Sequence, residues 1–110
     1  MNLESQVCSF NIAKRLKELG VKQKSAFFWT SNRELARPLA RHEPLFHWVS
    51  AFNVAELGEM LPFPFESGPG AKGGFQCSNR DGTLFKIADT EADARAKMLC
   101  YLIEKGIVKP

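Results

Sequence analysis

The residues that decide the fold lie near the end of the chain, where positions 90–105 read TEADARAKMLCYLIEK. Thr90 can cap a helix, and Asp93 follows at the spacing of a capping box. Acidic residues in this first turn also suit the positive end of the helix dipole. An apolar stripe continues at helical spacing and consists of Ala92, Ala96, Leu99, Leu102 and Ile103. The pattern predicts a helix over residues 90–105, ended by Gly106.

Two shorter helices are predicted upstream. Residues 9–19 begin with Ser9 as a cap and end before Gly20, and they have Ile12, Ala13, Leu16 and Leu19 on one face. Residues 53–61 begin with Asn53 and Glu56 at capping-box spacing and end before Pro62.

Short strands are predicted between and after these helices. The aromatic run 25–30 is typical of a buried strand, and residues 45–49 are a second candidate. Residues 75–78 and 83–87 flank an Asp-Gly pair and predict an antiparallel hairpin. The rest of 31–47 holds Pro38 and Pro44 and favours a loop with a short helical turn.

Together these elements predict the α+β class, with a small antiparallel sheet of three to four strands and about three helices packed on one face. A chain of 110 residues fits one domain spanning residues 1–110. Its stretch 62–74 is rich in Pro and Gly and is expected to be a flexible connection.

The composition is 45% hydrophobic and 25% charged, which is typical of a globular protein. No apolar run is long enough to span a bilayer, and residues 1–6 lack the pattern of a signal peptide. We therefore expect a cytoplasmic protein without a membrane partner. Cys8, Cys77 and Cys100 form no CxxC pair, so we expect three free thiols.

Basic residues are concentrated in the first part of the chain. Residues 1–41 contain eight Lys and Arg against three Glu, whereas the remainder contains seven against nine acidic residues. This half could bind nucleic acid, with phosphates held by Lys14, Lys17, Lys22, Lys24, Arg33, Arg37 and Arg41. The alternative is a solvated helix face with no ligand.

The motifs of a catalytic, cofactor or metal site are not recognisable in the sequence. His42 and His47 are the only histidines, and their spacing matches no zinc motif. The glycines of 68–74 depart from the Walker pattern G-x-x-x-x-G-K-[ST]. The sequence therefore favours a non-catalytic binding protein, with no cofactor and no metal.

A small core cannot bury every ring of a chain that has nine phenylalanines. We expect Trp48, Phe63 and Phe65 to form an exposed surface for a protein partner or a second copy of the chain. Pro62 and Pro64 would restrict the backbone around these phenylalanines.

Three stretches taken in order carry a resemblance to a known group. They are VCS at residues 7–9 leading into AKRLKELGVKQ at 13–23, VAELGEMLP at 54–62, and TEADARAKML at 90–99. With this order and spacing, the chain resembles small uncharacterised proteins found in phages, prophages and other mobile elements of bacteria. The resemblance implies a bacterial cytoplasm and a mobile-element setting, and it supplies no catalytic residue.

Overall fold

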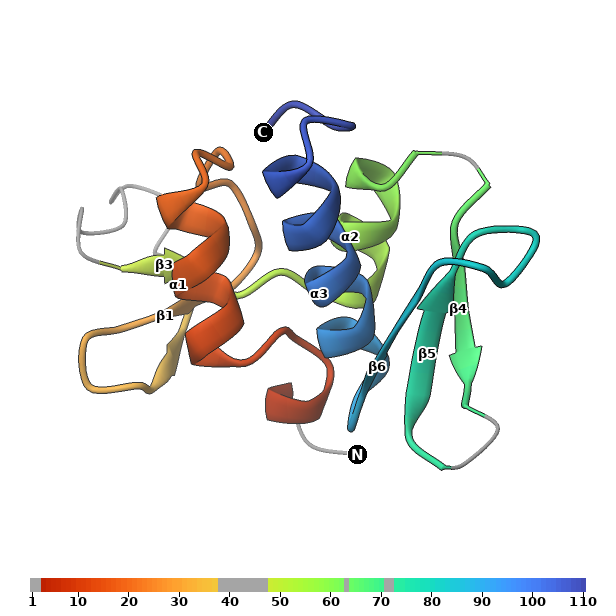
Figure 1. The fold of residues 1–110 in the computed structure, drawn as a ribbon. Helices are drawn as coiled ribbons and strands as arrows, with labels where there is room; N and C mark the ends of the chain where they lie inside the picture. The colour runs from red at the N-terminus through yellow and green to blue at the C-terminus, as the bar shows by residue number, and fades with distance from the viewer. Residues whose placement is uncertain (1–2, 38–47, 63, 71–72) are drawn as a thin grey trace.

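A computed structural model describes residues 3–37, 48–62, 64–70 and 73–110 of the chain (Figure 1). Within these residues the helices are the 3-10 helix η1 (Leu3–Ser5), α1 (Phe10–Glu18), α2 (Val54–Met60) and α3 (Glu91–Glu104). The strands are β1 (Phe28–Trp29), β2 (Leu35–Ala36), β3 (Val49–Ser50), β4 (Glu66–Pro69), β5 (Phe75–Ser78) and β6 (Phe85–Ala88). The α+β class and the three predicted helices are confirmed.

The strands form two antiparallel sheets of three, in the orders β2-β1-β3 and β4-β5-β6. Figure 1 shows α2 and α3 between these two sheets, with α1 beside the first of them. The sequence predicted a single sheet, with helices packed on one face. The second sheet exists because α3 is apolar on two sides, and each side packs against different strands.

Those two sides of α3 define two hydrophobic clusters. Ala92, Ala96 and Leu99 pack with a first cluster that includes Leu16 and Phe52. On the other side, a second cluster consists of Ala94, Met98, Leu102, Cys77 and Ala88. The predicted stripe was therefore incomplete, and it assigned Leu102 to the wrong side of the helix.

Local hydrogen bonds confirm most of the predicted helix ends but correct two of the caps. Asn53 and Glu56 form the complete capping box of α2, and Thr90 Oγ1 accepts from the backbone N–H of Asp93. The Asp93 carboxylate, however, accepts from the backbone N–H of Ser9 at 2.6 Å. Ser9 makes no side-chain cap hydrogen bond. The contact between Ser9 and Asp93 instead joins α1 to α3.

Two strands lie where the sequence favoured irregular structure. β2 forms a tight hairpin with β1, and Arg33 adopts a left-handed φ of 62° in the turn. β4 occupies Glu66–Pro69 within the predicted flexible connection and pairs with β5 over four residues. The predicted β5–β6 hairpin is confirmed. Residues 45–47 of the other candidate strand lie outside the described residues, while Val49 and Ser50 pair with β1.

Arg95 fastens α3 to both α2 and β4. Its Nη1 donates to the carbonyl of Val54 at 2.8 Å, and its Nε donates to Ser67 Oγ at 2.6 Å. The Ser67 hydroxyl in turn donates to Glu91 Oε2 at 2.7 Å. The guanidinium therefore occupies the space directly above Gly58.

This arrangement predicts the effect of adding a methyl group at Gly58. A Gly-to-Ala change inside a helix ordinarily stabilises a protein by about 0.5–1 kcal/mol. Here the new Cβ would overlap the Arg95 guanidinium and displace it from Val54. We expect Gly58→Ala to lower the free energy of unfolding by roughly 1 kcal/mol in urea titrations.

The control is the same substitution in two other contexts. In an Arg95→Met background, Gly58→Ala should raise the free energy of unfolding by about 0.5–1 kcal/mol, because the obstacle is gone. A Cβ at Gly68 meets nothing within 4 Å, so Gly68→Ala should stay within about 0.5 kcal/mol of the parent. A stabilising Gly58→Ala in the parent chain would contradict this account of Arg95.

Candidate functional site

Of the three residues predicted to form an aromatic surface, the structure describes Trp48 and Phe65 and places them on different elements. Trp48 precedes β3 and is half-buried, with its ring centroid 6.5 Å from that of Phe28. Phe65 precedes β4 and packs against the second cluster. These two sheets lie on opposite sides of α3 in Figure 1, so Trp48 and Phe65 are not neighbours. Phe63 lies outside the described residues.

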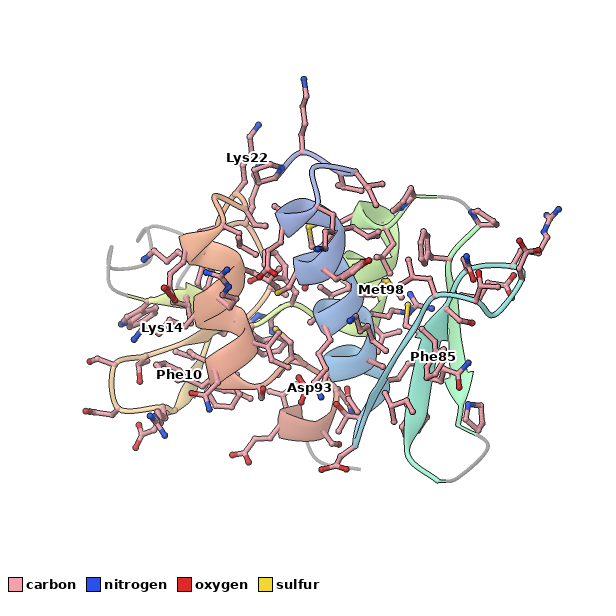
Figure 2. All side chains as sticks on the ribbon, in the orientation of Figure 1. Phe10, Lys14, Lys22, Phe85, Asp93 and Met98 are labelled. Atoms are coloured by element: carbon pink, nitrogen blue, oxygen red, sulfur yellow. The ribbon has the colours of Figure 1, made fainter. Side chains whose placement is uncertain are left out.

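The outward face of β6 is where large apolar side chains are exposed together. Phe85 is 48% exposed and Ile87 is 50% exposed, and strand alternation places both on one face. Across the sheet they pair with Ser78 and Gln76 of β5, which are polar. We call Phe85 and Ile87 the β6 apolar pair. Figure 2 shows Phe85 on the far side of α3 from Lys14 of α1.

The basic residues of the N-terminal half are spread over several elements. Lys14, Lys22 and Lys24 are exposed, while Lys17 Nζ donates to the carbonyl of Trp48 at 3.0 Å. Arg33 lies over the Phe10 ring at 5.0 Å, and Arg37 lies over the Phe27 ring at 6.0 Å. Arg41 lies outside the described residues. Of these cations, Lys22 and Lys24 line one hollow together.

Two of the aromatic residues that could have stacked on bases are in the core. Phe28 and Trp29 are buried, and Trp29 Nε1 donates to the carbonyl of Cys8 at 2.8 Å. The run 25–30 therefore serves the packing of the first sheet, as expected for a buried strand.

A different basic site, not predicted from the sequence, lies between α1, α3 and β6. This α1–α3 groove encloses about 390 Å³. Its lining consists of Asn11, Ile12 and Arg15 from α1, Lys97, Cys100, Tyr101 and Glu104 from α3, and Lys86 from β6. The spacing of Lys97, Tyr101 and Lys105 at four-residue intervals was the available signal, since it places them on one helix face.

The charged groups of the α1–α3 groove have specific partners. Arg15 Nη2 contacts Glu104 Oε1 at 2.8 Å, and this hydrogen bond raises the pKa of Arg15. Lys86 Nζ lies 4.4 Å from the centroid of the Tyr101 ring, and Lys105 Nζ lies 5.8 Å from it. Lys97 Nζ donates to the carbonyl of Ile87 at 3.0 Å.

The cysteines are free and poorly suited to nucleophilic catalysis. Burial raises the pKa of Cys8 from 9.0 to about 12, and it raises those of Cys77 and Cys100 to about 11. All three thiols are therefore protonated at neutral pH, whereas the reactive form of a cysteine is the thiolate.

Two absences hold for the part of the chain that the structure describes. No three His, Cys, Asp or Glu side chains in it are grouped to hold a metal ion. None of its helices combines the length and the apolar character that crossing a membrane requires. His42 and His47 lie outside these residues.

Comparison of the chain with protein-family models, curated proteins and solved structures finds no match. The resemblance to small phage and prophage proteins therefore stays a prediction, and the functional argument depends on the surfaces described above.

The raised pKa of Cys8 predicts how stability depends on pH. Above pH 9 the unfolded chain releases a proton that the folded protein keeps up to about pH 12. The contribution of Cys8 is therefore intact below pH 9 and is lost as the pH rises toward 12. At pH 10 the loss should be about 1 kcal/mol, measured by urea unfolding.

Cys8→Ala supplies the control, because it removes this thiol and should reduce the dependence of unfolding free energy on pH above 9, while Cys77 and Cys100 keep their own contributions. Ellman titration of the native protein near neutral pH should be slow, and it should become rapid in denaturant. Rapid labelling of Cys8 in the folded protein would contradict its burial.

Proposed function

We propose that this chain is a small non-catalytic binding protein that pairs with a second copy of itself through the outward face of β6. The observation that carries the proposal is the exposure of the β6 apolar pair, with Phe85 48% and Ile87 50% exposed. Two adjacent large apolar groups surrounded by polar residues resemble the core and rim of a protein interface.

The direction of these side chains follows from strand alternation. Ala88 is buried and Lys86 faces Tyr101 of α3, so Phe85 and Ile87 must point away from the helices. A slip of one residue would turn Lys86 and Ala88 outward together and would bring Phe85 and Ile87 onto the inner face. The apolar pair is therefore held outward by the packing of the inner face.

Pairing through the sheet face is favoured over pairing through the edge of β6. The carbonyl of Ile87 accepts from Lys97 Nζ, so this edge already carries a lysine that opposes strand addition. Two copies related by a two-fold axis would instead stack their β4-β5-β6 sheets face to face. Phe85 and Ile87 of each copy would then lie in the centre of the contact.

The setting that we propose for this protein is the cytoplasm of a bacterium, in connection with a mobile element. Three free cysteines suit a reducing compartment. The mobile-element connection depends on the sequence resemblance alone.

Matched substitutions at two exposed isoleucines test the pairing. Ile87→Thr keeps β propensity but removes apolar area, so it should weaken self-association. Combined with Phe85→Ser, the loss should reach tenfold or more, a factor worth about 1.4 kcal/mol. Ile107 is 62% exposed but lies outside β6, so Ile107→Thr should leave association unchanged. Sedimentation equilibrium of each variant, at low and high salt, provides the measurement.

The parent chain should associate to a similar extent at both salt concentrations, because an apolar contact is not screened. A parent protein that stays monomeric at about 1 mM would overturn the proposal. Equal loss of association in the Ile87 and Ile107 variants would also overturn it.

A further inference from the structure

The α1–α3 groove brings together cations that are far apart in the sequence. Arg15 comes from α1, Lys86 from β6 and Lys97 from α3, and all three line the same space of about 390 Å³. Lys105 lies outside this lining, but its Nζ is 5.8 Å from the ring of Tyr101, which belongs to it. A volume of this size falls in the ~300–1,000 Å³ range of ligand-binding clefts.

Among the described residues, Glu104 is the only carboxylate that lines the groove, and Arg15 donates two hydrogen bonds to it, at 2.8 and 3.1 Å. Lys86 and Lys97 have no carboxylate among the groove residues to neutralise them. The groove therefore carries a net positive charge that a row of anionic groups would complement.

Tyr101 supplies the aromatic surface of the groove. Lys86 Nζ lies over its ring at 4.4 Å, and a cation–π contact is weak at a site that is open to solvent. A phosphate that binds in the groove would therefore displace the Lys86 ammonium from the Tyr101 ring with a small loss of free energy. The exposed ring would then offer a flat surface to a base.

We propose that the α1–α3 groove binds single-stranded nucleic acid, with Lys86 and Lys105 contacting phosphates and Tyr101 contacting a base. Cations beside an aromatic ring in a groove are the combination that single-strand binding uses. A duplex keeps its bases paired and stacked, so it would contact the lysines but would not place a base on the Tyr101 ring. The proposal is independent of the pairing through β6.

This site differs from the basic surface that the sequence predicted. Of the cations that line the groove, only Arg15 comes from the N-terminal half, and it was not among the seven predicted. The predicted Lys22 and Lys24 line another hollow together with Glu56 and Glu59, whose carboxylates oppose anion binding there. These two lysines are therefore a matched control for Lys86 and Lys105.

The test compares two double variants that lose the same charge. Binding of fluorescein-labelled oligo-dT is measured by anisotropy over a series of salt concentrations. Lys86→Gln with Lys105→Gln should weaken binding on the order of tenfold at low salt, and it should reduce the slope of log K against log salt by about 1.4. Lys22→Gln with Lys24→Gln should leave both quantities close to the parent values.

Tyr101→Leu tests the aromatic contact and should weaken binding roughly fivefold or more, consistent with about 1–3 kcal/mol for stacking on a base. Tyr101→Phe should restore binding to nearly the parent level. Circular dichroism and thermal unfolding confirm that each variant is folded.

Four results would overturn the proposal. They are absence of oligo-dT binding at low salt, equal weakening by the two lysine pairs, tighter binding of duplex than of single strand, and binding of polyglutamate or inorganic polyphosphate as tight as that of oligo-dT. The last would show a general anion site in place of a nucleic-acid groove. A negative result in these oligo-dT experiments would not contradict the proposed pairing through β6, because self-association is measured without nucleic acid.

Discussion

The structure depends on one constraint, which is that α3 must bury two different sides. Ala92, Ala94 and Ala96 are all fully buried, although Ala94 faces the second cluster while Ala92 and Ala96 face the first. Their small side chains let neighbouring elements approach closely, while Met98 and Leu102 need a cover of their own. Burying one such side chain stabilises a fold by about 1.5–3 kcal/mol, so the burial of Met98 and Leu102 favours a second sheet over this side of α3. The first sheet, α1 and α2 cover the other side.

The segment at residues 7–9 determines how α1 lies against α3. The backbone N–H of Cys8 donates to the carbonyl of Phe52, and the carbonyl of Cys8 accepts from Trp29. The next N–H, that of Ser9, donates to Asp93 at the start of α3. At the other end, Arg15 contacts Glu104 near the end of α3. These two contacts make α1 and α3 run side by side in the same direction, and the groove is the space along their junction.

The elements that could be predicted from sequence are those decided by neighbours along the chain. Asn53 and Glu56 cap α2 within four residues, and the Asp-Gly pair closes the β5–β6 hairpin locally. β4 has no comparable signal, because its ESGP sequence shows no apolar alternation and Ser67 is held by side chains of α3. The α1–α3 groove could not be predicted from local patterns either, since Arg15 and Glu104 are 89 positions apart in the sequence. The predicted surface of Trp48, Phe63 and Phe65 likewise depended on a tertiary arrangement that local patterns do not reveal.

Strand alternation in β6 gives this short element two chemically different faces. Phe85 and Ile87 point outward, whereas Lys86 between them reaches Tyr101 in the groove. A second copy bound to the outward face would therefore leave the groove accessible. The same contact would stabilise β6, the strand that carries Lys86. A pair of copies would present two basic grooves in one particle. A single strand of nucleic acid long enough to reach both would then bind the pair more tightly than one copy, because the second contact is intramolecular. The four residues of β6 would in this way connect the association of two copies with their affinity for the ligand, without any change of fold.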